Sequence, residues 1–252
     1  MLIDLVKTRF QQKYRTMAWP DGPAPALPER FQGRPVIAGT CQADCQVCVD
    51  LCPAKAVALK DRAPRIDSGL CLFCGKCAAA CPSKVITFTK EYRLAARNRE
   101  DLVVGPGSPA YPDALVEKAR NLFGRSLKLR EVSAGGCNAC EADSNVLTTI
   151  GWDLGRFGIQ FVASPRHADG IFITGPVTKN MEAAVLKTYQ AVPQPRIVIA
   201  TGACAIGGGP FAGNPEHVHG GASVVPVDLY IPGCPPHPLT ILDGMLRFIG
   251  RI

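Results

Sequence analysis

Apolar residues are arranged in two different ways along this chain, and the change falls near residue 112. After it, continuous apolar runs alternate with stretches of helical periodicity. The runs are 158–162, 170–174, 196–200 and 224–227, and the helical stretches are 114–123, 138–149, 178–191 and 238–249. Runs that are apolar on both faces are typical of strands in a parallel sheet covered by helices. The pattern therefore predicts an α/β domain over residues 112–252.

The earlier part of the chain contains a repeat over residues 36–90. A short apolar strand is expected before each of two cysteine runs, at 35–37 and 64–66, and another after each, at 56–59 and 85–88. The two copies are offset by about 29 residues, as in a duplicated fold. Prolines interrupt residues 19–35, and residues 91–110 carry charges followed by glycine and proline, so both stretches are predicted to be linkers.

Residues 1–18 are predicted to form a helix with its apolar residues near one side. That side carries Leu2, Leu5, Val6 and Phe10, with Arg9 among them. Two interpretations remain open. The helix packs against its own domain, or it is an amphipathic segment that contacts membrane-bound partners.

Composition and charge narrow the class of protein. Of the 252 residues, 47% are hydrophobic and 19% are charged, as in a folded globular protein. No apolar run reaches the roughly 18 residues of a membrane-spanning helix, and the N-terminus lacks a signal-peptide pattern, so a cytoplasmic location is expected. The formal charge of +7 fits a soluble basic surface, an acidic partner or an anionic membrane face. No block of arginine and lysine occurs, so nucleic acid is not an expected partner.

The twelve cysteines fall into three groups of four with none left over. The groups are Cys41, Cys45, Cys48 and Cys52; Cys71, Cys74, Cys77 and Cys81; and Cys137, Cys140, Cys204 and Cys234. Because no export signal is recognised, disulfides are not expected, and clustered cysteines favour metal ligands.

The second group has the spacing C-x2-C-x2-C-x3-C-P, the ligand run of a bacterial ferredoxin with two iron–sulfur clusters. Three closely spaced cysteines wrap one four-iron cube, and the fourth, before a proline, reaches the other cube. The predicted ligand sets are Cys41, Cys45, Cys48 and Cys81 for one cluster, and Cys52, Cys71, Cys74 and Cys77 for the other. In the first run three residues separate Cys41 from Cys45, which enlarges that loop. Structural zinc is the alternative, but eight cysteines, two Cys-Pro pairs and the duplication favour iron–sulfur clusters.

The third group is dispersed, with a C-x2-C pair at Cys137 and Cys140 and single cysteines at Cys204 and Cys234. Glycine lies beside or close to each of these loops, and glycine allows the backbone to approach a cluster closely. The carboxyl ends of parallel strands share one edge of a sheet, which is where ligands of such domains gather. Four thiolates at that edge would hold one [4Fe–4S] cluster, whereas the C-x2-C pair alone also fits the redox dithiol of a thioredoxin-like site.

Several motifs in this half resemble those of one family. They are Cys-Asn-Ala-Cys at 137–140, Ser-Pro-Arg-His-Ala-Asp-Gly at 164–170, Thr-Gly-Pro-Val-Thr at 174–178, Thr-Gly-Ala-Cys at 201–204 and Pro-Gly-Cys-Pro-Pro at 232–236. The family is the small subunit shared by membrane-bound [NiFe] hydrogenases and the cluster-bearing B-type subunit of respiratory complex I. The resemblance covers residues 112–252, and residues 36–92 separately resemble the ferredoxin-like subunit of the same assemblies.

This resemblance implies a fusion of two domains. An α+β ferredoxin-like domain with two [4Fe–4S] clusters (36–92) is followed by an α/β flavodoxin-like domain with a parallel sheet (112–252), with a helix and linker at 1–35 and a linker at 93–111. The two residues between Cys137 and Cys140 resemble formate hydrogenlyase and energy-converting hydrogenase members, whereas complex I members have adjacent cysteines. Family hydrogenases also carry an acidic group after the second cysteine, where Glu141 and Asp143 lie, and Glu141 is the candidate for proton transfer.

The predicted protein is an electron-transfer subunit of a membrane-bound [NiFe] hydrogenase-type complex with three [4Fe–4S] clusters, acting in proton reduction or H₂ oxidation. Its expected partners are a catalytic large subunit that carries the Ni-Fe site, other hydrophilic and membrane subunits, and a soluble electron donor. It would lie peripherally on the cytoplasmic face of the inner membrane.

Three alternatives remain. The first alternative is a complex I-like subunit that transfers electrons to quinone or drives ion transport without nickel. The second is a free-standing electron carrier. A zinc-stabilised interaction or nucleic-acid module is the third alternative.

Overall fold

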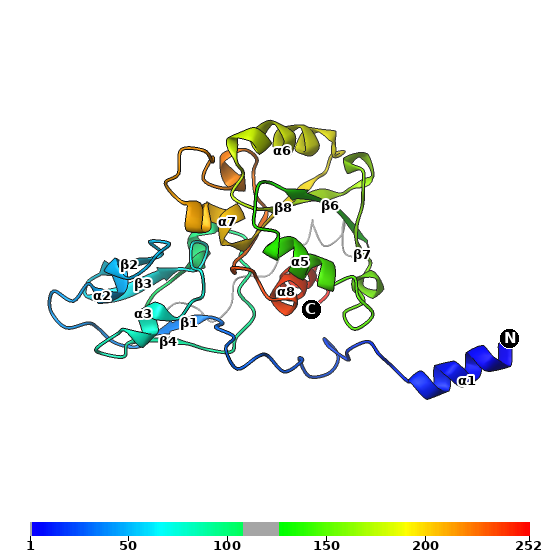
Figure 1. Ribbon diagram of the computed structural model, residues 1–252, viewed down its shortest axis with the longest axis horizontal. Coiled ribbons are helices and arrows are strands. Elements are labelled where there is room, and N and C mark those ends of the chain that lie inside the picture. Colours follow the sequence, from blue (N-terminus) through cyan, green and yellow to red (C-terminus); the bar gives the residue numbers. More distant parts are fainter. Residues whose placement is uncertain (1, 108–125) are drawn as a thin grey trace.

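The computed structural model describes residues 2–107 and 126–252. Two lobes lie side by side, and a single helix projects from the larger lobe on the side away from the smaller one (Figure 1). The smaller lobe holds the predicted ferredoxin-like residues and the larger lobe holds the α/β residues. The helix expected over 114–123 falls outside the described residues.

Helices and strands alternate along most of the chain. The helices are α1 (Leu2–Gln12), α2 (Val47–Asp50), α3 (Lys76–Ala79), α5 (Ala139–Val146), α6 (Lys179–Ala191), α7 (Gly202–Gly207) and α8 (Pro238–Phe248). The strands are β1 (Pro35–Ile37), β2 (Val57–Lys60), β3 (Ala63–Asp67), β4 (Ile86–Phe88), β5 (Val103–Val104), β6 (Leu127–Ser133), β7 (Ile159–Phe161), β8 (Gly170–Thr174), β9 (Ile197–Thr201) and β10 (Leu229–Ile231). Short 3₁₀ turns lie at Arg99–Leu102, Leu154–Phe157, Pro165–His167, Gly209–Phe211 and Gly221–Ser223.

The larger lobe is built on a five-stranded sheet in which every pairing is parallel, as predicted. Its spatial order is β7-β6-β8-β9-β10. Numbered within this lobe, the order is 2-1-3-4-5, the flavodoxin-like arrangement. In such sheets ligands bind outside the carboxyl ends of the strands, where the order reverses, and here the reversal lies between β6 and β8.

Two strands of this sheet differ from the prediction. The sequence pattern missed β6, because Lys128, Arg130 and Glu131 interrupt its apolar residues, although Leu127 and Leu129 are fully buried. The run at 224–227 is not a strand; it follows a 3₁₀ turn and contains Pro226, which cannot donate a ladder hydrogen bond. The next strand, β10, begins two residues later, at Leu229.

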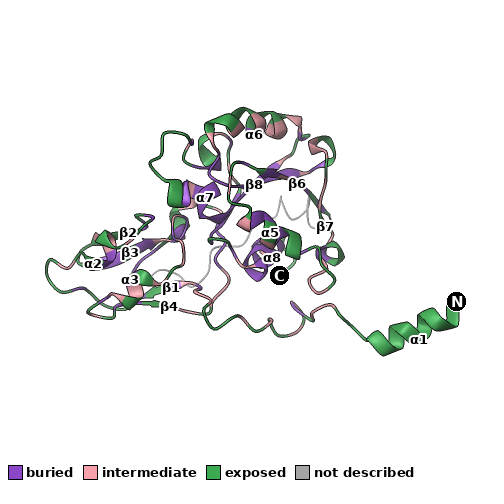
Figure 2. Ribbon diagram, viewed as in Figure 1, coloured by how far each residue is buried: buried purple, intermediate pink, exposed green. Residues whose placement is uncertain are grey.

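Both faces of the sheet are covered, which is why its central strands are apolar throughout. All five residues of β8 and of β9 are buried. Phe172 packs with α8 on one face, and its neighbours Ile171 and Ile173 pack with Val185 of α6 on the other. Figure 2 shows the buried sheet between the more exposed α6 and the buried α8.

The smaller lobe confirms the expected duplication. Strand β1 pairs antiparallel with β4, and β3 pairs antiparallel with both β2 and β5. The short helices α2 and α3 occupy equivalent places in the two copies. The core of this lobe is small and contains the side chains of Cys41, Cys48, Cys71, Cys77 and Cys81 beside aliphatic residues.

The stretches predicted as linkers are held against the lobes. Residues 19–34 contain no helix or strand, as expected, but the Trp19 ring is buried in the core of the larger lobe. Within the other stretch, β5 adds a strand to the smaller lobe, and Ala96 exchanges two backbone hydrogen bonds with Tyr230 of the larger one (2.9 and 2.8 Å). These contacts attach this stretch to both lobes.

The N-terminal helix is shorter than predicted. It ends at Gln12, and Lys13 has a left-handed backbone (φ 55°) that stops the helix. None of the residues of α1 is buried, so its side chains do not pack on the rest of the protein. Among residues 2–107 and 126–252, no helix has both the length and the apolar character needed to cross a bilayer.

Replacing Phe172 with alanine should lower the free energy of unfolding by about 3–5 kcal/mol, because the ring is fully buried and leaves a cavity. Unfolding in urea, followed by circular dichroism, measures this. The matched variant Phe10→Ala removes the same ring from a position where it is 79% exposed, and it should change stability by less than about 0.5 kcal/mol. Similar losses for the two variants would contradict this account of the core.

Candidate metal centres

All twelve cysteines are unpaired thiols, and the structure gathers them into three tetrads. Tetrad 1 is Cys41, Cys45, Cys48 and Cys81; tetrad 2 is Cys52, Cys71, Cys74 and Cys77; and tetrad 3 is Cys137, Cys140, Cys204 and Cys234. Each tetrad draws on more than one stretch of chain. In the smaller lobe, each tetrad takes three sulfurs from one cysteine run and the fourth from the Cys-Pro pair of the other run.

Tetrad 1 lies around α2. Burial raises the pKa of the Cys41 and Cys48 thiols, and the neighbouring charges of Cys45 and Cys81 raise both further. A thiolate at Cys41 or Cys48 would therefore be repelled by nearby sulfurs and would have little contact with water. A cation at the centre is what relieves such a cost.

Tetrad 2 is more deeply buried at two of its sulfurs. Burial raises the pKa of Cys71 to about 12 and that of Cys77 to about 11. Two backbone amides point at sulfur in this tetrad. The Phe73 amide donates to Cys71 Sγ at 3.3 Å, and the Ala56 amide donates to Cys52 Sγ at 3.2 Å. Such N–H···S bonds stabilise negative charge on sulfur.

Tetrad 3 sits at the carboxyl edge of the parallel sheet. Cys137 follows β6, Cys140 lies in the first turn of α5, Cys204 lies in α7 directly after β9, and Cys234 follows β10. Burial raises the pKa of Cys204 to about 12, and it also raises the pKa of Cys140 and Cys234. The other sulfurs of the tetrad raise these pKa values further. The topology thus brings three separate loops to one point.

Glycine permits this approach. Gly202, at the end of β9, has a left-handed backbone (φ 89°), and a Cβ atom there would lie 2.6 Å from Cys140 Sγ. A side chain would therefore collide with the tetrad. The short loops also use left-handed residues: Phe73 lies between Cys71 and Cys74 (φ 50°), and Asn138 lies between Cys137 and Cys140 (φ 68°). These conformations tighten each C-x2-C loop and turn backbone amides toward its sulfurs.

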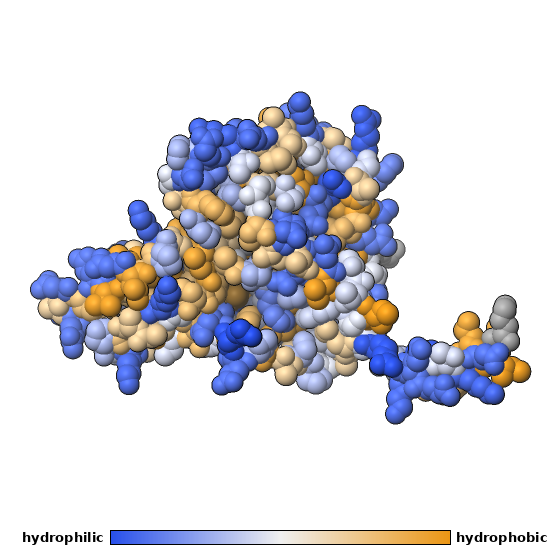
Figure 3. Space-filling view, in the orientation of Figure 1, coloured by the Kyte–Doolittle hydropathy of each residue, from blue (hydrophilic) through white to orange (hydrophobic). Residues whose placement is uncertain are grey.

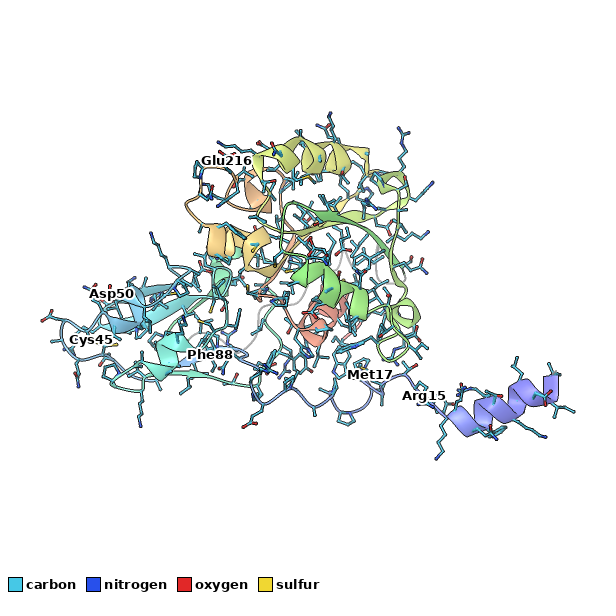
Figure 4. All side chains as sticks on the ribbon, in the orientation of Figure 1. Arg15, Met17, Cys45, Asp50, Phe88 and Glu216 are labelled. Atoms are coloured by element: carbon cyan, nitrogen blue, oxygen red, sulfur yellow. The ribbon has the colours of Figure 1, made fainter. Side chains whose placement is uncertain are left out.

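The three tetrads are arranged in series, with tetrad 2 near both of the others. Cys48 of tetrad 1 and Cys77 of tetrad 2 are close enough to interact electrostatically, and so are Cys74 of tetrad 2 and Cys234 of tetrad 3. Cys45 lies at the end of the smaller lobe farthest from the larger one (Figure 4). Tetrad 2 therefore lies between the other two, and it meets tetrad 3 across the boundary between the lobes.

The predicted proton-transfer residue Glu141 is buried beside tetrad 3. Burial raises the pKa of its carboxyl group, but hydrogen bonds from Ser133 (2.6 Å) and Thr174 (2.7 Å) to Oε1 outweigh burial, and the pKa lies below the ordinary value. The ionised form is therefore favoured. Asp143 is half-buried, and burial raises the pKa of its carboxyl group.

Sequence reasoning missed Glu131, a second carboxyl group near Glu141. It accepts a hydrogen bond from Ser144 (2.7 Å), and burial followed by the charge of Glu141 raises its pKa. Both carboxylates line a cavity of about 610 Å³ between β6, β7 and α6. Glu131 lies on β6, and the apolar pattern did not reveal this strand. No signal in the sequence therefore pointed to Glu131.

The donor set of each tetrad fits an iron–sulfur cluster. Each offers four thiols without a disulfide, and each has at least one buried cysteine, whereas Cys74, Cys137 and Cys234 are exposed. Within the described residues, no three histidine, cysteine, aspartate or glutamate side chains converge closely enough to hold a single metal ion. In a four-iron cube each thiolate binds a different iron, so the four sulfurs of such a site lie farther apart than the ligands of one tetrahedral ion.

Comparisons with known proteins agree with this donor chemistry. Residues 137–248 match the family described as NADH ubiquinone oxidoreductase, 20 Kd subunit, and residues 40–85 match the 4Fe-4S dicluster domain. A probable membrane-bound hydrogenase subunit of Pyrococcus furiosus is 42% identical over 52% of this chain and 78% of its own length. The chain belongs to the 20 Kd subunit family of NADH ubiquinone oxidoreductase.

Other relatives of this chain include both a formate hydrogenlyase subunit and an NADH-quinone oxidoreductase subunit. Formate hydrogenlyase subunit 7 of Escherichia coli is 44% identical over 51% of this chain, which spans half of that protein's length. The B-type subunit of the NADH-quinone oxidoreductase of Heliobacterium modesticaldum is 41% identical over 47% of this chain and 69% of its own length. Among solved structures, the membrane-bound sulfane sulfur reductase contains a chain that is 32% identical, with a TM-score of 0.43, covering 52% of this chain and 75% of that one.

Family membership and the dicluster domain together define the chemical class of this protein. It is an iron–sulfur subunit of the oxidoreductase class, with a ferredoxin-like domain joined to the 20 Kd subunit fold. Cysteine thiolates are the usual ligands of iron–sulfur clusters.

In the metal-free chain, the rates at which iodoacetamide alkylates Cys71 and Cys204 should rise about tenfold per pH unit between about pH 8 and 10, because the thiolate is the reactive form. Their pKa values of about 12 place this whole range below the midpoint of titration. Peptide mapping by mass spectrometry gives each rate separately.

The same chain in concentrated urea is the control. Burial is lost there, so both rates should level off above the ordinary thiol pKa of about 8.5. A plateau near that pH in the native chain would contradict the burial of these two thiols.

Proposed function

We propose that this chain is the electron-transfer subunit of a membrane-bound [NiFe] hydrogenase-type complex. It relays electrons through three [4Fe–4S] clusters between a soluble donor and a catalytic large subunit that reduces protons or oxidises H₂. The observation that carries the proposal is the serial placement of three thiol tetrads, with tetrad 2 adjacent to both others.

Each tetrad holds one cluster in this proposal. Cys41, Cys45, Cys48 and Cys81 bind the first; Cys52, Cys71, Cys74 and Cys77 bind the second; and Cys137, Cys140, Cys204 and Cys234 bind the third. When bound, a cluster of this kind supplies one-electron transfer at a potential set by its charge, its hydrogen bonds and its exposure. Twelve thiols are thereby used, so the Ni-Fe site lies on the partner protein.

The protein's own groups prepare these sites. The amides of Ala56 and Phe73 donate to ligand sulfurs, which favours the additional negative charge of a reduced site. Buried aliphatic side chains such as Ile66 and Ile86 surround tetrads 1 and 2 and exclude water. The proximity of Cys74 to Cys234 sets the separation of tetrads 2 and 3 within one folded chain.

The spacing of Cys137 and Cys140 supports the hydrogenase-type assignment, because two residues separate them. Two hydrogenase or formate hydrogenlyase subunits are among the relatives, at 42% and 44% identity. We assign the chain a peripheral place at the cytoplasmic face of the inner membrane, beside other hydrophilic and membrane subunits. Glu141 is the candidate for proton transfer near tetrad 3, although its geometry favours the ionised form.

A complex I-like protein that works without nickel is the second candidate. The observation that favours it is the 41% identity to the B-type subunit of an NADH-quinone oxidoreductase over a similar part of the chain. The two candidates share the tetrads and differ in the partner's metal.

The nickel content of the native complex separates these candidates. When the complex is purified anaerobically through a tag on this chain, about one nickel per complex is expected, together with H₂-dependent reduction of a viologen dye, since the large subunit supplies the Ni-Fe site. A complex that contains the large subunit and has neither nickel nor hydrogen activity would contradict the hydrogenase assignment.

The number of clusters can be tested at Gly202. The anaerobically reconstituted chain should contain about twelve iron atoms, since each four-thiolate site holds four. Gly202→Ala should lower this to about eight, because the added Cβ would lie 2.6 Å from Cys140 Sγ and disrupt tetrad 3 alone. Iron and sulfide analysis measures the change.

Gly213→Ala is the matched control. Gly213 also has a left-handed backbone (φ 86°), but a Cβ there meets no atom within 4 Å. Its iron content should stay at the value of the unaltered chain. Four irons in the unaltered protein, or equal losses in both variants, would refute the assignment of three clusters.

A further inference from the structure

Helix α1 exposes apolar side chains to an unusual degree. Leu2 is 80% exposed and Phe10 is 79% exposed, and Ile3 and Leu5 are similar. No residue of the helix is buried, and the helix stands clear of both lobes (Figure 1). A contiguous apolar surface of this kind usually marks a binding site for a membrane or another protein.

The apolar residues of α1 share one half of the helix. At 100° per residue, Leu2, Ile3, Leu5, Val6 and Phe10 fall within one half of the circumference. The other half carries Asp4, Lys7, Thr8, Gln11 and Gln12. Figure 3 shows apolar and hydrophilic side chains on the projecting helix.

The charged residues of this segment are mostly positive. Lys7, Arg9, Lys13 and Arg15 are exposed basic residues, and the only acidic residue between 2 and 15 is Asp4. A basic segment next to an apolar surface complements anionic lipid headgroups above an acyl layer.

The position of Arg9 favours a bilayer over a protein groove. It lies four residues after Leu5, on the same side of the helix, and its guanidinium donates to the Lys13 carbonyl (2.6 Å) near the Tyr14 ring. In an apolar groove this charge would lose its water at high cost. At a bilayer interface, long basic side chains reach up to the phosphates while their stems and nearby apolar residues stay in the acyl layer.

The length of the helix defines how it lies. Eleven residues span about 16 Å, whereas a crossing helix needs about 20 residues, so α1 would lie in the plane of the interface. The next residues are fixed to the larger lobe. The Met17 amide donates to the Gly151 carbonyl (2.9 Å), and Arg156 donates to the carbonyls of Met17 and Trp19 (2.8 and 2.6 Å).

This fixed point makes the helix a short tether. Arg15 lies between the helix and the clamped Met17 (Figure 4). A helix bound in the headgroup region would therefore hold the larger lobe close to the membrane surface.

We propose that α1 is an interfacial anchor that binds directly to a bilayer containing anionic lipid. Its apolar half, from Leu2 to Phe10, inserts among the acyl chains, and its basic residues contact lipid phosphates. The anchor acts without a partner protein. It goes beyond electron transfer and does not depend on the cysteine tetrads.

The test is flotation of the anaerobically reconstituted full chain with lipid vesicles. With roughly one quarter phosphatidylglycerol in phosphatidylcholine, the chain should float with the vesicles, and raising the salt from about 0.05 to 0.5 M should release most of it. Pure phosphatidylcholine vesicles should bind it about tenfold less.

Matched variants locate the interaction. Leu5→Glu should reduce binding at least about tenfold, whereas Leu186→Glu, at an exposed leucine of α6, should leave it unchanged. Lys7→Gln combined with Lys13→Gln should also reduce binding about tenfold, whereas Lys187→Gln on α6 should not. Circular dichroism and the visible spectrum should be the same for all variants, which separates loss of anchoring from loss of clusters.

Three results would overturn the proposal. In the first, the unaltered chain does not bind the vesicles. In the second, it binds neutral and anionic vesicles equally and without salt dependence. In the third, Leu5→Glu binds as well as Leu186→Glu. If Leu5→Glu keeps vesicle binding but loses co-purification with another protein of the complex, α1 docks on protein and the membrane anchor is refuted.

Discussion

The structure depends on how closely thiol groups can be packed away from water. Burial raises the pKa of Cys71 and Cys204 to about 12, and neighbouring sulfurs in each tetrad raise it further. Four thiolates cannot share such a site unless a cationic centre neutralises them, so each tetrad favours an iron–sulfur cluster over free thiolates. The left-handed loop residues, the glycine beside Cys140 and the amides aimed at sulfur all serve this single requirement.

The contact between the two lobes bears on the separation of the tetrads. Electron transfer between sites requires a short and constant separation, and Cys74 and Cys234 come from different lobes. At that boundary Ala96 exchanges backbone hydrogen bonds with Tyr230 of the larger lobe. The stretch that contains Ala96 is in turn fixed to the smaller lobe, because β5 pairs with β3 and Arg99 forms a bidentate ion pair with Asp67 (2.8 and 2.6 Å). Fusion of the domains makes the spacing a property of one fold instead of an encounter between two proteins.

The flavodoxin-like sheet contributes an edge on which separate loops converge. Its carboxyl ends carry tetrad 3 at the place where doubly wound folds usually bind a ligand, and the carboxyl group of Glu141 lies beside it. Hydrogen bonds from Ser133 and Thr174 hold that carboxylate in one orientation. The exposed basic helix α1 stands clear of both lobes, so the proposed membrane anchor and the proposed cluster sites lie on separate parts of the chain.

The spacing of the cysteines by itself predicted the ligand sets of the smaller lobe. Three cysteines in one short loop can reach the same cluster, and the cysteine before a proline in the other run is the expected fourth ligand. Continuous apolar runs likewise predicted β8 and β9, which are buried on both faces. Only the tertiary structure revealed β6, because the charged residues Lys128 and Arg130 interrupt its apolar pattern. It also showed that residues 19–34 and 91–107 pack against the lobes. It also decided that Cys74 lies near Cys234 and that Glu131 lies near Glu141. These residues are distant in sequence or lie on different elements, and the packing of whole elements brings them together.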